Sequence, residues 1–480
     1  MRIPRYQQVL FLVSTGVFMS TMDSSMVNVA LPTLMKVFTS SLAATEWVVL
    51  VYLLTITVSL LFWGYFSNTI GHGKLYWRGV LVFTLGSLLC TLAPSIGTLI
   101  VFRLVQATGA SMMMAMGPAL IKSSYPPEKL GQGLGMVGIA TSLGLMSGPV
   151  ISGLLLRWAH WRFIFLVTVP VGLLLYIAGG RLLRNLGRPD AETIKRVQPF
   201  DRTGGLLYVL AVILTVLSLS HATKTCCQGD GMSLVKIALP ALFWLLFVWW
   251  ELRCPWPILP VRLFASRFYA VAMICAMLSF VVLFFVLLLM PFYLSKVRGY
   301  PPDQVGWFMM SVPLCVFFVA PLAGHLHDRI GARIIATLGL AFCLVSLVLL
   351  TRLEMGSAPA FIVAALALLG VGQAMFLAPN SASALSGVPH EKSGITASLL
   401  ATSRNMGMLF GTALAGYIFA HQYAALTGGM DIRDFTSEHA LAFIRALRIT
   451  FQAGVLLAAV AVLLSTVRGS GRDQATGRQQ

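Results

Sequence analysis

Residues 268–294 read FYAVAMICAMLSFVVLFFVLLLMPFYL and contain no Asp, Glu, Lys or Arg. A helix needs about 20 mainly apolar residues to cross the hydrocarbon core of a bilayer, and this stretch is longer than that. It is also too long for a strand of a membrane barrel, and it lacks the alternation of apolar and polar residues that such strands show. The stretch therefore predicts a transmembrane helix.

Similar apolar stretches recur along the whole chain, which is 58% hydrophobic and 10% charged. A soluble protein carries about 25% charged residues. Lipid admits only helices and closed barrels, because every backbone polar group must be satisfied within the protein. We predict an all-α integral membrane protein with fourteen spans, at 8–31, 46–66, 76–95, 98–119, 133–156, 161–181, 203–220, 234–250, 268–294, 303–325, 333–352, 358–379, 393–420 and 441–466. The spans at 203–220 and 234–250 have barely the minimum length, and without them the chain would have twelve.

The formal charge of +18 does not indicate a nucleic-acid-binding protein, because the basic residues lie in short loops between apolar stretches. Their bias predicts that both termini are cytoplasmic, and a bacterial inner membrane is the expected location. The longest basic segment runs from Arg181 to Arg202. It divides the predicted domains, which are a six-span bundle (1–181), a cytoplasmic linker with two additional spans (182–267), a second six-span bundle (268–466) and a disordered cytoplasmic tail (467–480).

Asp23 lies deep in the first span, in the sequence FMSTMDSSMVN at 18–28. A carboxylate costs a few kcal/mol at this depth, so acids within spans generally have a function. At 100° per residue, Ser20 and Asn28 share a polar stripe beside it, which we assign to the substrate cavity. Asp23 could exchange a proton as its surroundings alternate. The alternative is a structural carboxylate in a permanent ion pair.

Arg103 is the second charge within a predicted span, and Asp23 is a candidate partner. Arginine stays charged at physiological pH, so contact in only one conformation would couple protonation to conformation. The alternative is that its side chain reaches the lipid headgroups.

Two further charged residues are candidates for the substrate cavity. Arg404 is the third charge within a span, with packing as the alternative, and Glu46 begins the second span, where we expect a solvated residue at the mouth. No nucleophile with a base, metal-ligand set or phosphate-binding loop is recognisable, so we expect no enzyme activity, no metal and no cofactor.

Glycine patterns mark one span and two loops. The span at 133–156 carries Gly144, Gly148, Pro149 and Gly153, a small-residue spacing that permits close helix packing. Two loops share a pattern about 260 residues apart, which predicts two related halves. The loop residues that we assign to cytoplasmic gates are Gly64, Asn68 and Gly71 in the first loop and Gly324, Asp328, Arg329 and Gly331 in the second.

Several motifs occur together along almost the whole chain. They are Asp23 with VNVALP at 27–32, WVVLVYLL at 47–54, Arg103 with Gln106 and Gly109, the glycine-proline set of 144–153, WRFIF at 161–165 with PVG at 170–172, and Asp328–Arg329 with Gly331. Together they resemble the fourteen-span drug:proton antiporter family of the major facilitator superfamily.

This resemblance implies two six-helix bundles that rock about a central cavity, with two additional spans between them. It implies that Asp23 and Arg103 take part in proton coupling, that Gln106 lies in the substrate cavity and that the glycines of 144–153 form an antiport motif. The first loop departs from the family pattern, because Asn68 stands where an Asp is usual and Thr69, His72 and Gly73 stand where basic residues are expected. The charge pairs that hold the inner gate closed are therefore expected to be weakened or replaced.

The leading hypothesis is proton-coupled export of small lipophilic compounds, with protons and the lipid bilayer as its other partners. One alternative is export of one specific metabolite, peptide or siderophore by the same fold. Another is a membrane sensor or assembly protein without transport activity. A periplasmic adaptor and an outer-membrane channel remain open as partners.

Overall fold

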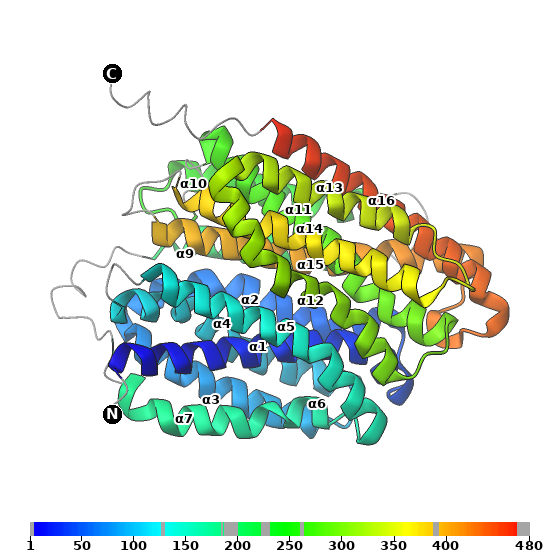
Figure 1. The fold of residues 1–480 in the computed structure, drawn as a ribbon, viewed down its shortest axis with the longest axis horizontal. Helices are drawn as coiled ribbons and strands as arrows, with labels where there is room; N and C mark the ends of the chain where they lie inside the picture. The colour runs from blue at the N-terminus through cyan, green and yellow to red at the C-terminus, as the bar shows by residue number, and fades with distance from the viewer. Residues whose placement is uncertain are drawn as a thin grey trace. The chain divides into compact units, whose positions relative to one another are not determined.

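The computed structural model describes residues 4–125, 130–183, 186, 200–221, 231–259, 264–386 and 393–467. All regular structure in these residues is helical (Figure 1). The fourteen long helices are α1 (Arg5–Val37), α2 (Leu42–Ile70), α3 (His72–Thr91), α4 (Ile96–Ser124), α5 (Leu130–Trp158), α7 (Thr168–Leu183), α9 (Arg202–His221), α10 (Gly231–Arg253), α11 (Arg267–Phe292), α12 (Pro302–Ile330), α13 (Ala332–Leu350), α14 (Pro359–Ser386), α15 (Ser393–Leu426) and α16 (Ala440–Thr466). Short helical turns are α6 (Phe163–Leu166), η4 (Tyr293–Val297), η6 (Ile432–Asp434) and η7 (Ser437–His439).

Each predicted span corresponds to one of these long helices, which confirms the predicted fold class. Within the described residues, 11 helices are long and apolar enough to cross a membrane. The two stretches of barely sufficient length form α9 and α10, so both are helical. Several helices extend beyond the apolar stretches that predicted them, because helical hydrogen bonding continues into polar residues at the membrane surface. The helix α1, for example, begins three residues before its predicted span and ends six residues after it.

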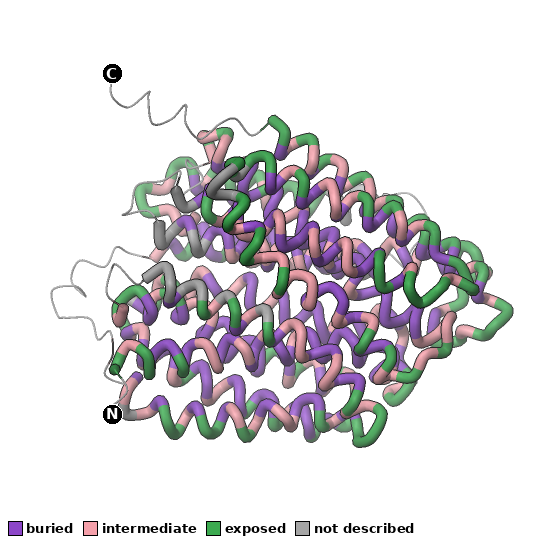
Figure 2. Tube along the Cα trace, viewed as in Figure 1, coloured by how far each residue is buried: buried purple, intermediate pink, exposed green. Residues whose placement is uncertain are grey.

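The burial pattern of the helices is that of a membrane protein. Large apolar side chains such as Leu174, Ile177, Leu456 and Leu463 are exposed on the outer faces, whereas Asp23 is completely buried. Figure 2 shows buried and exposed turns alternating along most helices. Exposed apolar surface on this scale is stable only against lipid or a partner.

The chain forms two compact units. The N-terminal unit comprises residues 1–40, 44–212 and 301–306, and the C-terminal unit comprises 41–43, 213–300 and 307–480. In the first unit α1 packs on α5 and α3 packs on α4; in the second, α11 packs on α15 and α13 packs on α14. The domain limits predicted at 181 and 267 remain predictions, and almost all of the predicted tail lies outside the described residues.

Glycines make the first of these helix pairs close in both units. In the N-terminal unit, a Cβ atom on Gly144 would lie 2.7 Å from the carbonyl oxygen of Phe18, and one on Gly148 would lie 2.9 Å from that of Met22. In the C-terminal unit, a Cβ atom on Gly407 would lie against the carbonyl oxygen of Met277, and one on Gly411 would lie 2.7 Å from that of Val281.

The second helix pair is close for the same reason. A Cβ atom on Gly109 of α4 would lie 2.7 Å from the carbonyl oxygen of Gly79 in α3. In the C-terminal unit, one on Gly372 of α14 would lie 2.6 Å from that of Gly339 in α13. Such distances exclude any larger residue unless the backbones separate.

Candidate functional site

The helices α1 and α4 bring Asp23 and Arg103 into direct contact. Arg103 Nη1 donates a hydrogen bond to Asp23 Oδ2 at 2.6 Å, and the two side chains are 0% and 1% exposed. The sequence proposed this pair, and the structure places the two residues together. Removing one partner of such a buried pair typically costs roughly 3–5 kcal/mol, because it leaves an uncompensated charge.

Gln106, one helical turn after Arg103, joins both members of the pair. Its Nε2 donates to Asp23 Oδ1 at 2.9 Å, and its Oε1 accepts from Arg103 Nη1 at 2.7 Å. The same Nε2 also donates to Ser87 Oγ on α3 at 2.7 Å. We refer to Asp23, Ser87, Arg103 and Gln106 as the ion-pair network.

The remaining faces of the Arg103 guanidinium contact α2 and α6. Nε donates to the carbonyl oxygen of Val48 at 3.2 Å. The ring of Tyr52 lies 4.0 Å from Cζ, and that of Phe165 lies 5.8 Å from it. A cation over an aromatic face gains roughly 0.5–2 kcal/mol. Arg103 therefore has partners besides Asp23.

The close contact of α3 with α4 positions this network. A Cβ atom on Gly86 of α3 would lie 2.5 Å from Cα of Gln106, so the two helices touch beside the network. Ser87 is the next residue along α3, and its Oγ lies where it can accept from Gln106. The glycines thus set the distance across which these side chains meet.

The glycines of α5 serve packing in this structure. Gly144 and Gly148 lie against α1, and Ser152 Oγ donates to the carbonyl oxygen of Met26 at 2.8 Å. Within the same unit, a Cβ atom on Gly153 would lie 2.7 Å from the carbonyl oxygen of Pro302. Pro149 is buried inside α5.

The residues assigned to the substrate cavity belong to both compact units. Ser20 Oγ lies 3.0 Å from Tyr52 Oη, which places it beside the network, and Asn28 is 5% exposed. Arg404 belongs to the C-terminal unit, where its Nη2 donates to Ser381 Oγ at 2.6 Å.

The prediction that Glu46 is solvated was wrong, because the residue is only 5% exposed. Its Oε1 is buried and has no hydrogen-bond partner within the described part of the chain. Its position at the start of an apolar stretch did not reveal this burial.

The two gate loops have the same backbone conformation at their second glycine. Gly71 precedes α3 with φ 93°, and Gly331 precedes α13 with φ 94°, a region that favours glycine. Gly64 and Gly324 have open space around them. The side chains of Asn68, Asp328 and Arg329 lie outside the described residues.

Gly73 explains part of the departure of the first loop from the family pattern. Its N–H donates to the carbonyl oxygen of Leu186 at 3.2 Å, and a Cβ atom would lie 2.7 Å from that oxygen. A basic side chain could not be placed at this position without moving the segment after α7.

Three contact residues of the site were not predicted as site residues: Tyr52, Ser87 and Phe165. Each lies in an apolar helix; motifs included Tyr52 and Phe165 without assigning them a role, and no pattern marked Ser87. Within the described residues, no group of three His, Cys, Asp or Glu side chains could hold a metal ion.

Comparison with known proteins agrees with this architecture. Residues 13–412 match the Major Facilitator Superfamily. The chain is 32% identical to a riboflavin transporter, RibZ, of Clostridioides difficile over 434 residues, covering 90% of this chain and 92% of the relative. It is 32% identical to the multidrug resistance protein Stp of Mycobacterium tuberculosis over 416 residues, covering 86% and 76%.

A solved structure shows the same fold. It is a bacterial homologue of the human lysosomal transporter Spinster in an inward-facing, unoccupied conformation. The TM-score is 0.66 at 14% identity, and the alignment covers 98% of each chain. The matched region and the shared fold together establish that this chain is an integral membrane transporter belonging to the Major Facilitator Superfamily.

Proposed function

We propose that this transporter is a proton-coupled antiporter that exports small lipophilic compounds by alternating access. The observation that carries the proposal is the buried contact between Asp23 and Arg103, joined by Gln106. An ionised Asp23 attracts Arg103, whereas a protonated Asp23 does not. Protonation would therefore weaken one contact between α1 and α4 and favour a different arrangement of the helices.

The surroundings of Arg103 support a pair that can separate. When Asp23 takes a proton, Arg103 keeps Gln106 Oε1, the Val48 carbonyl oxygen and the Tyr52 ring. These contacts reduce the cost of leaving a buried guanidinium without its carboxylate.

The compounds exported are proposed from the relatives. Similarity to Stp, a multidrug resistance protein, favours several lipophilic compounds. Similarity to a riboflavin transporter supports a second candidate, the transport of one specific metabolite. We place both termini in the cytoplasm of a bacterial inner membrane, and a periplasmic adaptor with an outer-membrane channel remains an open prediction.

The test is transport by purified protein in liposomes under an imposed proton gradient. The Asp23→Asn variant keeps the shape of the side chain but cannot ionise, and it has one acceptor oxygen in place of two. We expect it to lose gradient-driven substrate movement by at least about tenfold while remaining folded. The matched control is Asp434→Asn, because Asp434 is an exposed carboxylate paired with Arg433.

Gradient-driven transport retained by Asp23→Asn would remove Asp23 from the coupling mechanism. Loss of transport in both variants would mean that the carboxylates matter for stability rather than coupling. A panel of dyes, biocides, antibiotics and riboflavin as substrates distinguishes several exported compounds from one.

A further inference from the structure

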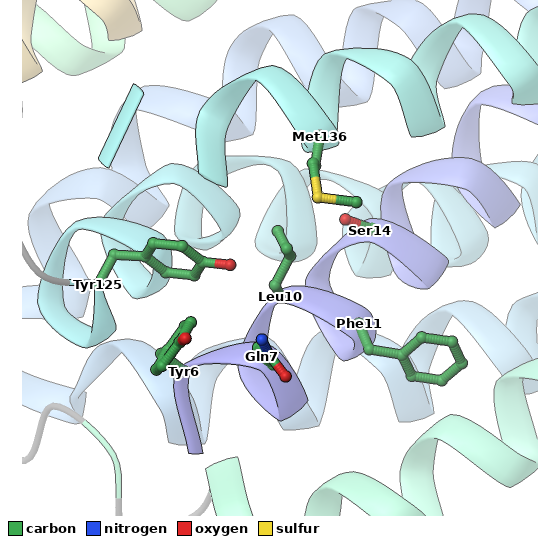
Figure 3. Close-up of a pocket in the computed structure, with 7 residues that line it drawn as sticks. All are labelled: Tyr6, Gln7, Leu10, Phe11, Ser14, Tyr125 and Met136. Atoms are coloured by element: carbon green, nitrogen blue, oxygen red, sulfur yellow. The ribbon is translucent and has the colours of Figure 1, made fainter. Parts of the chain in front are cut away.

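The N-terminal unit contains a cavity of about 500 Å³ that lies away from the ion-pair network. It is formed where α1 begins, at Tyr125 after the end of α4, and at Met136 of α5 (Figure 3). Gln7, Leu10 and Ser14 line it from successive turns of α1. Its volume is within the range typical of small-molecule sites, roughly 300–1,000 Å³.

The cavity lies on the N-terminal side of the described glycine contacts between α1 and α5. Their close contact is at Gly144 and Gly148, and closer to the start of both helices the larger side chain of Met136 faces α1 instead. Tyr125 follows the last turn of α4, where Gly133 of α5 lies against its ring. The described lining of the cavity thus comes from α1, α5 and the residue after α4.

Aromatic rings form one end of the cavity. The rings of Tyr6 and Tyr125 meet edge to face, with centroids 5.0 Å apart and planes at 78°. Phe11 is 71% exposed at another edge, and Met136 supplies a polarisable thioether. Aromatic faces and methionine sulfur bind flat aromatic compounds well.

One hydroxyl in the cavity lacks a partner. Ser14 Oγ is buried and has no hydrogen bond within the described residues, whereas its neighbour Thr15 donates to the Phe11 carbonyl oxygen at 2.8 Å. A buried hydroxyl without a partner is costly, and a ligand that hydrogen-bonds it would recover that cost. Gln7 adds an amide that can donate and accept.

None of the described residues lining the cavity is charged. A cationic or anionic ligand would lose part of its hydration here without gaining a counter-charge from these side chains. A neutral compound would lose much less.

We propose that this cavity binds a neutral, planar heteroaromatic compound with polar groups on its edge. Because we place the N-terminus in the cytoplasm, the cavity would be a loading site for the exported compound, and in this respect it depends on the proposed function. The aromatic rings would contact the ligand face, and Ser14 and Gln7 would bind its polar edge.

The test is equilibrium binding to the full chain in lipid nanodiscs without a proton gradient. Riboflavin serves as the neutral fluorescent probe, ethidium as a planar cation and fluorescein as a planar anion. We expect saturable quenching of riboflavin and weaker binding of both charged probes. Ser14→Ala should raise the Kd roughly 2- to 10-fold, and Tyr125→Leu by a similar factor.

Thr15→Ala is the matched control, because its hydroxyl is already bonded to the helix, and it should leave the Kd unchanged. Thermal unfolding of each variant separates lost binding from lost folding. Absent riboflavin binding, tighter binding of a charged probe, or unchanged binding in both Ser14→Ala and Tyr125→Leu would overturn the proposal. A cavity that merely holds lipid chains would give the last result.

This experiment fails or succeeds separately from the transport assay. Binding that follows the variants, combined with no gradient-driven transport, would keep the site and reject proton coupling. Normal proton-coupled transport without binding at this cavity would keep the proposed coupling and reject the site.

Discussion

The two compact units repeat the same close helix contacts but differ in what lies between the helices. Gly148 of α5 meets the carbonyl oxygen of Met22, and Gly411 of α15 meets that of Val281. Met22 of the N-terminal unit and Val281 of the C-terminal unit therefore occupy matched positions. The glycine contacts of α4 and α14 match Gly109 with Gly372. The two units can therefore be compared residue by residue.

On this alignment every member of the ion-pair network has an apolar counterpart. Asp23, Ser87, Arg103 and Gln106 correspond to Val282, Leu347, Leu366 and Leu369. All four of these apolar residues are at most 1% exposed. The same helix packing thus has apolar residues at these four positions in one unit and a charged network at the matched positions in the other.

This difference indicates that the fold does not require the charges. A buried ion pair is often no more stable than apolar residues of similar volume, because desolvation offsets the attraction. The network is therefore better explained by function than by packing. Three experiments would test that explanation.

The largest effect is expected when the network is broken at one residue. Arg103→Leu introduces the residue found at the matched position, Leu366, and leaves Asp23 buried without its cation. We expect a loss of roughly 3–5 kcal/mol in unfolding free energy. Chemical or thermal unfolding of the purified protein measures it.

The complementary variant replaces the whole network by its counterparts, as Asp23→Val, Ser87→Leu, Arg103→Leu and Gln106→Leu. It should recover the stability lost in Arg103→Leu, to within about 1–2 kcal/mol of the parent or above it, but show no proton-coupled transport. If the fourfold variant were as unstable as Arg103→Leu, the charges would contribute to folding and the comparison would fail.

An intermediate effect is expected at the matched glycines. Gly109→Ala and Gly372→Ala each force a methyl group against a neighbouring helix, at a cost of roughly 1–3 kcal/mol. Both should lower stability, but Gly109→Ala should reduce coupled transport more, because it moves α3 and Ser87 away from Gln106. Unfolding and liposome transport together measure the two effects.

Gly97→Ala is the control for these substitutions, because Gly97 is also on α4 and has open space around it. It should change neither stability nor transport appreciably. Equal loss of coupling in Gly109→Ala and Gly372→Ala would show that the network is not specially sensitive to the spacing of its own helices.

The smallest effect is expected in the loops, where His72 follows Gly71 and Ala332 follows Gly331. Burial lowers the pKa of the His72 imidazole below its usual value of about 6.5. At a pH between the lowered pKa of the folded chain and the usual pKa of the unfolded chain, His72 binds a proton only in the unfolded chain. Acidification therefore lowers stability.

The variant His72→Ala makes the first loop resemble the second and removes this proton. When the pH is lowered from 7.5 to 5.5, the Tm of the parent should fall further than the Tm of the variant. The difference between the two decreases should be at most about 2 °C. Melting curves at the two pH values measure the difference. An identical pH dependence would show that His72 is not responsible.

The sequence predicted the fold well because the bilayer restricts the possibilities. Fourteen apolar stretches implied fourteen helices, since lipid permits few other structures. It also identified Asp23 and Arg103, because charged residues are conspicuous in apolar stretches, and the family motif added Gln106. Ser87 was missed, because a serine in a membrane helix usually bonds its own backbone and carries no distinctive pattern.

Burial at the ends of helices was predicted less well. Glu46 begins an apolar stretch, and such a position is solvated in many membrane proteins, yet here it is enclosed. Whether a residue at a helix end reaches water depends on the helices that pack around it. No local pattern contains that information.

By itself, the sequence determined that the chain is a bundle of membrane helices in two related halves and that few charges lie inside it. Hydrophobic length and the cost of buried charge are local properties, so they can be read along the chain. Only the tertiary structure decided that Arg103 meets Asp23 through Gln106 and Ser87, and that the matched positions of the other half are apolar. Those contacts join helices far apart in sequence, and the approach of backbones at glycines sets their distances.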